Sequence, residues 1–251
     1  MNRKRLLDRF LQYVQIDTTA DEDSTTYPSS LGQLEIGKLL VQQMTDMGIE
    51  DAAQDEFGIV TGTVPGTVDA PVVAFNSHVD TAPETTGKNV KPRVIENFDG
   101  NDIVLAGDPT KVITAATCEE LTGAKGKTII TTDGTTLLGG DDKAGVAILM
   151  TAARHLLANP QIKHGKIRLA FTPDEEIGRG IHPDLPRDLA ADFAYTFDGG
   201  ALGNIEYESF SADGAKVHIE GVSIHPGTAK DTLDALAADW KATFAKYGRG
   251  Q

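Results

Sequence analysis

Four short segments of the sequence place histidine or acidic residues after an apolar run or a pair of glycines. They are FNSHVD at 75–80, LLGGDDKAG at 137–145, FTPDEEIGRG at 171–180 and YTFDGG at 195–200. Taken singly, each pattern is typical of a strand end, a helix cap or an acidic turn. Four such segments in one chain are harder to explain in that way. A histidine with several carboxylates predicts a site for one or two zinc ions, with manganese or cobalt as substitutes.

The spacing within the first two segments suggests how they contribute. His78 and Asp80 are two residues apart, so in an extended chain they point to the same side. His78 can then offer a ring nitrogen to a metal ion while Asp80 supports the site from behind. In LLGGDDKAG, the two glycines before Asp141 and Asp142 allow the backbone to approach a bound group closely.

The third segment contains three consecutive acids, Asp174, Glu175 and Glu176. Glu175 and Glu176 are adjacent, so their side chains point in different directions. One can ligate a cation while the other acts as a general base on a water molecule. Asp174 has no predicted role. In the fourth segment, Asp198 ends another apolar strand and is a further candidate ligand.

The elements that must position these residues follow from apolar periodicity. Helical spacing predicts helices near residues 6–14, 31–47 and 143–158, and a last helix at 233–244. Short β-rich runs predict strands at 72–75, 128–131, 166–171, 193–197 and 215–221. Residues 83–126 are predicted to form irregular structure and short ribbons. This alternation predicts an α/β sheet with helices on its faces, where the loops at the carboxyl ends of the strands build the site.

Composition narrows the class of protein. The chain has 251 residues, of which 40% are hydrophobic and 24% charged, as in ordinary globular proteins. Its formal net charge of -14 argues against nucleic acid or an anionic membrane as the main partner. A single cysteine excludes an internal disulfide framework, and we expect a cytoplasmic location.

Together with HPGTAK at 225–230, the four segments resemble the zinc aminoacylase and carboxypeptidase superfamily. The resemblance implies a zinc-exopeptidase-like mixed sheet flanked by helices. Residues 1–207 would form the N-terminal part of the catalytic domain, and residues 208–251 the incomplete beginning of an inserted lid domain. Members of the superfamily continue beyond the length of this chain, so we expect a C-terminally truncated sequence.

The resemblance also implies a role for each matching residue. One zinc ion would be held by His78, Asp141 and Asp198. Asp141 would bridge to a second zinc ion held also by Glu176, and the distal histidine ligand of that ion is missing. A cis peptide bond is expected between Asp141 and Asp142.

Three further roles follow from the same resemblance. Asp80 would orient the zinc-ligating histidine, and Glu175 would be the general base and acid. His225 would contact the bound substrate.

Three longer motifs resemble aminopeptidases that act on tripeptides: TTGKNVKPRVIENFDG at 85–100, ITTDGTTLLGGDDKAGVA at 130–147 and HGKIRLAFTPDEEIGRG at 164–180. This resemblance implies a dinuclear zinc enzyme releasing the N-terminal residue. Its partners would be short peptides. Two alternatives stay open: a weakly active or inactive metal-binding fragment, and a related metal-dependent deacylase or carboxypeptidase. An uncovered sheet edge would favour homo-oligomers.

Overall fold

The computed structural model describes residues 2–180, 182–200 and 203–207. The chain divides into two compact units, Met1–Asn204 and Ile205–Gln251, and every element described below lies in the first. The strand predicted at 215–221 and the helix predicted at 233–244 lie outside the described residues. No helix in the described part of the chain is long and apolar enough to cross a membrane.

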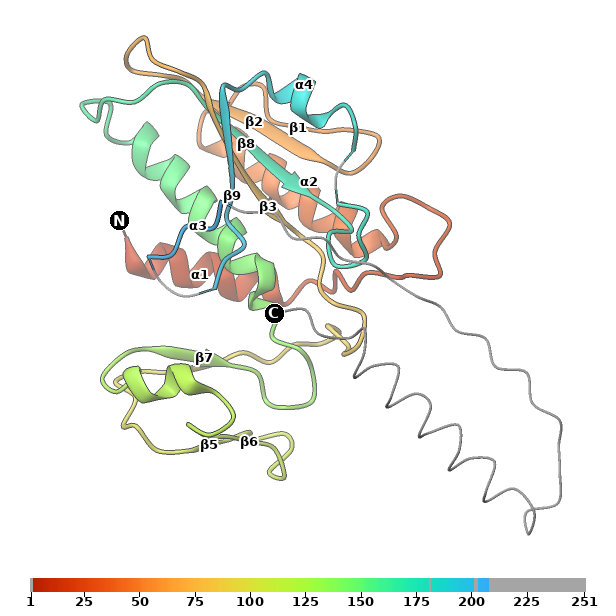
Figure 1. Ribbon diagram of the computed structural model, residues 1–251, viewed down its shortest axis with the longest axis vertical. Helices are drawn as coiled ribbons and strands as arrows, with labels where there is room; N and C mark the ends of the chain where they lie inside the picture. Colours follow the sequence, from red (N-terminus) through yellow and green to blue (C-terminus); the bar gives the residue numbers. More distant parts are fainter. Residues whose placement is uncertain (1, 181, 201–202, 208–251) are drawn as a thin grey trace, which may run out of the picture. The chain divides into compact units, whose positions relative to one another are not determined.

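A five-stranded mixed sheet forms the centre of the first unit (Figure 1). Its strand order is β1-β2-β8-β3-β9, and β3, β8 and β9 are mutually parallel. The strands β1 and β2 complete the sheet in antiparallel pairing. The bounds are β1 Ala53–Gln54, β2 Val60–Val64, β3 Val73–His78, β8 Ile167–Thr172 and β9 Phe193–Thr196. Because three parallel strands run side by side, their carboxyl ends meet at one edge of the sheet.

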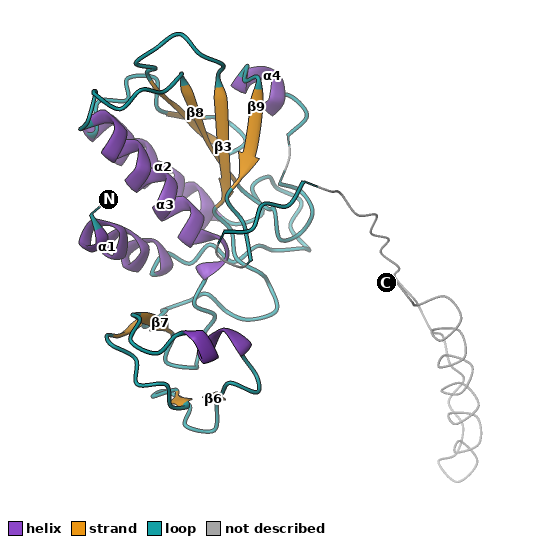
Figure 2. Cartoon of the chain, turned by 60° about the vertical axis from the view of Figure 1, so that its left-hand side comes forward, coloured by secondary structure: helices purple, strands orange, loops and turns teal. Residues whose placement is uncertain are grey.

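The two faces of the sheet are covered unequally. Helices α1 (Arg3–Val14), α2 (Leu31–Asp46) and α3 (Gly140–Leu157) contribute to one large apolar core against the first face. The short helix α4 (Leu185–Leu189) packs against a small cluster on the second face. Figure 2 shows α2 and α3 lying along the strands. Alternate strand residues supply the two cores, as the pleat of a strand requires.

The strand β2 is absent from the sequence predictions, because VTGTV lacks a strong apolar run. Its Gly62 faces α2: a Cβ there would lie 3.0 Å from Met44 Sδ and 3.0 Å from Ile49 Cγ2. Close packing of helix on sheet therefore explains a glycine inside a strand.

Residues between β3 and α3 form short ribbons, as the sequence predicts. The strand pairs are β4 (Arg93–Ile95) with β7 (Ile129–Thr131) and β5 (Ile103–Val104) with β6 (Val112–Ile113). A 3₁₀ turn spans Glu119–Gly123. These ribbons enclose a small apolar cluster of their own, which contains Phe98, Ile103 and Leu105.

Candidate metal centre

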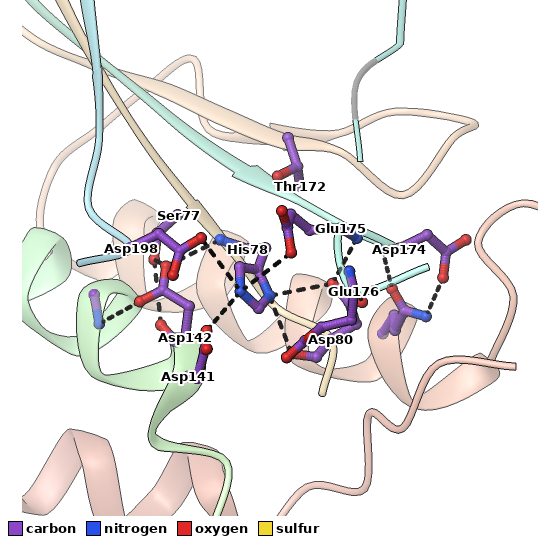
Figure 3. Close-up of polar contacts among 12 residues, drawn as sticks. Ser77, His78, Asp80, Asp141, Asp142, Thr172, Asp174, Glu175, Glu176 and Asp198 are labelled. Carbon is purple, nitrogen blue, oxygen red and sulfur yellow. Dashed lines mark hydrogen bonds and ion pairs between the residues drawn. The ribbon is translucent and has the colours of Figure 1, made fainter. Parts of the chain in front are cut away.

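The parallel strands bring the predicted site residues to one edge of the sheet (Figure 3). His78 is the last residue of β3. Glu175 and Glu176 follow β8, and Asp198 follows β9. Asp141 enters from the first turn of α3. Four segments that are distant in the sequence therefore meet around one imidazole ring, and we call these five residues the His78 cluster.

The distances around His78 Nε2 are short. Asp141 Oδ1 lies 2.9 Å away, and Glu175 Oε2 and Asp198 Oδ2 each lie 3.8 Å away. Two groups of three residues have ligand atoms within 4.8 Å of one another: His78 with Glu175 and Asp198, and His78 with Asp141 and Glu176. The cluster therefore offers a nitrogen and several carboxylate oxygens in the spacing that a divalent cation needs.

The histidine of the cluster is buried, whereas its acids are partly exposed to solvent. The His78 side chain is 1% exposed, whereas those of Asp198, Glu175 and Asp141 are 30%, 49% and 69% exposed. Burial alone lowers the pKa of His78, but the hydrogen-bonded Asp80 and further nearby acids raise it to about 10. The imidazole thus faces a strongly negative surrounding, and a bound cation would offset the same negative charge.

Asp80 supports the cluster from inside the protein. Its carboxylate is fully buried, and Oδ1 lies 3.3 Å from His78 Nδ1. The backbone N–H of Glu175 donates to Oδ1 and that of Glu176 donates to Oδ2, each at 3.0 Å. One carboxylate therefore fixes both the imidazole ring and the two residues after β8.

Three acids of the cluster, Glu175, Glu176 and Asp198, have raised pKa values, first because of burial and then because of neighbouring acids. Burial raises the pKa of Glu175, the His78 charge lowers it, and Asp198 raises it again. Burial and Asp141 raise the pKa of Glu176. Burial likewise raises the pKa of Asp198, the His78 charge lowers it, and Asp141 raises it again. Carboxylates held together in this way suit a divalent cation, which would favour their ionised forms.

The two acids at the start of α3 have different partners. Asp141 faces His78, whereas the buried Asp142 accepts hydrogen bonds from Ser77 Oγ, from the His78 N–H and from the Gly145 N–H. The bond from the Gly145 N–H, three residues on, is of the kind found at helix starts, and the backbone of Asp142 itself is not helical. The peptide bond between the two acids is cis, as the resemblance implies.

Gly145 allows this convergence. A Cβ there would lie 2.2 Å from Phe197 O, 2.4 Å from Asp142 Oδ1 and 2.6 Å from Ser77 Oγ. Only a residue without a side chain lets α3 approach β3 and the segment that carries Asp198. Gly145, the last glycine of LLGGDDKAG, is thus required for close packing between the segments that carry the site residues.

The structure therefore places His78, Asp80, Asp141, Glu175, Glu176 and Asp198 together. His225 lies outside the described residues. Glu175 is expected to act as a base, but in the structure its carboxylate lies close enough to His78 and Asp198 to be a metal ligand with them. Asp142 was not a predicted site residue, although its place in the pair after two glycines pointed to a cap.

Comparison with known proteins shows which peptidase family the sequence resembles. Residues 116–238 match the model of Peptidase family M20/M25/M40. That range includes Asp141, Glu175, Glu176 and Asp198. Over that range the chain is similar to this peptidase family, which agrees with its mixed sheet and its candidate metal centre.

The sequence is also similar to Peptidase T. It is 53% identical to Peptidase T of Bacillus cereus over 234 residues, which is 92% of this chain. The same figures hold for Peptidase T of Bacillus thuringiensis. The chain spans 57% of the length of each of these relatives.

Two solved structures share the fold. The aminopeptidase PepT of Bacillus cereus is 26% identical, with a TM-score of 0.55 over 80% of this chain and 44% of that one. A tripeptidase of Staphylococcus aureus is 29% identical, with a TM-score of 0.54 and the same coverage. The similarity thus extends across most of the present chain and less than half of each solved one.

Proposed function

We propose that this chain forms the metal-binding part of a dinuclear zinc aminopeptidase that releases the N-terminal residue from tripeptides. The observation that carries the proposal is the convergence of one imidazole and four carboxylates from four segments, with ligand atoms within 4.8 Å in each group of three. The similarity to Peptidase T and to a tripeptidase supports the choice of substrate.

The family resemblance assigns the ligands to two ions, and this assignment differs from the two groups of three, in which His78 lies with Glu175 and Asp198 or with Asp141 and Glu176. His78, Asp141 and Asp198 would hold one zinc ion, and Asp141 and Glu176 would hold the second. Imidazole nitrogen and carboxylate oxygen are donors that zinc accepts. When bound, zinc would polarise the scissile carbonyl and lower the pKa of the attacking water.

Glu175 would move the proton. Its side chain is half exposed and lies beside His78, and its raised pKa suits a base that works near neutral pH. Glu175 Oε2 would take a proton from the attacking water as the new carbon–oxygen bond forms. It would deliver that proton to the leaving nitrogen as the carbon–nitrogen bond breaks. His225, outside the described residues, would contact the substrate.

The test combines metal content with product analysis. Purified 251-residue chain is loaded with zinc, and its zinc content is measured by mass spectrometry beside that of Glu175→Gln. Both proteins are then incubated with tripeptides and with N-acylated amino acids. We expect both to retain zinc, and the wild-type chain to release free N-terminal residues from tripeptides. Glu175→Gln should lose about 100-fold or more of this rate, because general base catalysis contributes that much.

Two results would contradict the proposal, and a third would restrict it to metal binding by this chain. If the chain binds no zinc, the proposed metal site is wrong. A zinc-loaded chain that cleaves only N-acylated amino acids identifies the related deacylase instead. A zinc-loaded chain without turnover on either substrate corresponds to the metal-binding fragment. The variant Asp51→Asn, which changes a carboxylate bonded to Thr63 and Arg168, serves as a control and should retain both zinc and turnover.

A further inference from the structure

Asp174 is the one acid of FTPDEEIGRG outside the His78 cluster, and it is fully buried. Its carboxylate accepts hydrogen bonds from the Ser29 N–H at 2.7 Å, from Ser29 Oγ and from Gln33 Nε2 at 2.6 Å. The Asp174 N–H donates to Gln33 Oε1 at 2.9 Å. Four hydrogen bonds therefore join this residue to a single region. We call Ser29, Gln33 and Asp174 the Asp174 cluster.

The partners of Asp174 belong to a rigid element. Ser29 lies just before α2, and Gln33 lies in its first turn. Helix α2 is anchored in the large core by Ile36, Leu40 and Met44, all fully buried. The carboxylate thus ties the end of β8 to a helix more than 140 residues away in the sequence.

A second tie holds the other end of the same segment. The Arg179 guanidinium donates to Ser24 O at 3.0 Å and to Glu22 O at 3.1 Å. Within the segment, the Arg179 N–H donates to Asp174 O at 2.8 Å, which closes a turn around Glu175 and Glu176. Residues 174–179 are therefore docked on residues 22–33 at both ends.

The backbone changes direction at Asp174. Its φ is 57°, in the left-handed region that aspartate adopts more readily than most residues. This turn sends Glu175 and Glu176 away from α2 and toward Asp80, which accepts their N–H groups. The orientation of the two glutamates thus depends on where the preceding residue is fixed.

We propose that Asp174 is a positioning residue: its buried hydrogen bonds to Ser29 and Gln33 set the backbone from which Glu175 and Glu176 reach the His78 cluster. Its importance for metal binding rests on the proposed function. Its effect on the backbone does not, because the hydrogen bonds of Asp174 go to Ser29 and Gln33 and involve no residue of the His78 cluster.

The experiment measures amide hydrogen exchange in the metal-free, 251-residue chain by NMR. In Asp174→Asn, one acceptor oxygen becomes a donor that faces the donors of Ser29 and Gln33. We expect the amides of Glu175 and Glu176 to exchange about tenfold faster, with the change confined to residues 174–179. Ser29→Ala, which removes only the hydroxyl donor, should give a smaller change in the same amides and covers the case in which Asp174→Asn does not fold.

Asp51→Asn is the matched control. The Asp51 carboxylate also accepts three hydrogen bonds, from the Thr63 N–H, the Thr63 hydroxyl and the Arg168 guanidinium. These contacts lie at the other end of β8. It should leave the exchange of residues 174–179 unchanged. Unchanged exchange in both Asp174→Asn and Ser29→Ala, or equal acceleration across β2, β3 and β8, would overturn the proposal.

A second measurement separates the positioning role from the proposed function. Cobalt affinity is measured by visible absorption for the wild type, Asp174→Asn and Asp51→Asn. We expect Asp174→Asn to weaken binding about 10- to 100-fold, as loss of a supporting residue does, and Asp51→Asn to leave it unchanged. Equal affinities in all three would overturn the metal-related part of the proposal. A wild type that binds no cobalt would refute the proposed function, and the exchange result would still decide the positioning role.

Discussion

The His78 cluster and the Asp174 cluster lie at the same edge of the sheet, and they differ in what surrounds their negatively charged carboxylates. In the Asp174 cluster, a fully buried carboxylate is surrounded by N–H and O–H donors. In the His78 cluster, carboxylates face one another and a single imidazole. Two adjacent residues, Asp174 and Glu175, belong to these contrasting surroundings.

The difference shows which acids are structural. A carboxylate that is buried but fully hydrogen-bonded stabilises the fold, because its desolvation is offset by its donors. In the His78 cluster, burial and neighbouring acids raise the pKa values of Glu175 and Glu176, and a bound cation would favour their ionised forms. The number of hydrogen-bond donors around each carboxylate therefore separates support from function.

The largest expected effect concerns zinc and the His78 cluster. Zinc at 100 times its dissociation constant should raise the free energy of unfolding by about 2.7 kcal/mol, because it binds only the folded state. His78→Ala should abolish this gain, and Asp51→Asn should keep it. Chemical denaturation with and without zinc measures the effect, and a gain that survives in His78→Ala would locate the ion elsewhere.

The next effect concerns how the His78 cluster is assembled. Gly145→Ala should lower the free energy of unfolding by about 1–3 kcal/mol, because the new methyl group meets Phe197 O and the Asp142 carboxylate. Gly140→Ala is the matched control in the same helix, since a Cβ at Gly140 would have no heavy atom within 4 Å beyond its chain neighbours and the nearby helix backbone. Equal urea midpoints for the two variants would show that this close approach is unimportant.

A smaller loss is expected in the Asp174 cluster. Ser29→Ala should lower the free energy of unfolding by about 1 kcal/mol, because one donor to a buried carboxylate is lost while the Ser29 N–H and Gln33 remain. Thermal unfolding of the metal-free chain measures the change. Unaltered stability would mean that the hydroxyl adds nothing to the cluster.

The smallest effect has the opposite sign. Glu176→Gln should stabilise the metal-free chain by about a few tenths of a kcal/mol, because it removes a partly buried charge and its repulsion by Asp141, both of which solvent largely screens. The same variant should weaken zinc binding. A loss of stability in the metal-free chain would place Glu176 with the structural acids and would break the comparison.

Much of the fold is predictable because its apolar residues recur at regular spacing. The helices α1, α2 and α3 and the strands β3, β8 and β9 all follow from such runs. The strand β2 does not, because its central glycine is required by a helix that packs on it. That requirement arises from tertiary packing and has no local signal.

The candidate site is predictable for a related reason. Strand ends that carry acids or histidine meet at one edge when the strands are parallel, so His78, Glu175 and Asp198 could be grouped from the sequence. The roles of Asp142 and Asp174 could not. Each depends on partners more than 60 residues away, Ser77 for one and Ser29 with Gln33 for the other.

The central claim is that the carboxylates around His78 form a metal site. Its most direct test is a crystal structure of the zinc-loaded chain, with anomalous scattering measured on both sides of the zinc absorption edge. The account predicts a zinc peak bonded to His78 Nε2 and to carboxylate oxygens of the His78 cluster. The absence of a peak there, with the protein folded and zinc present in excess, would contradict it.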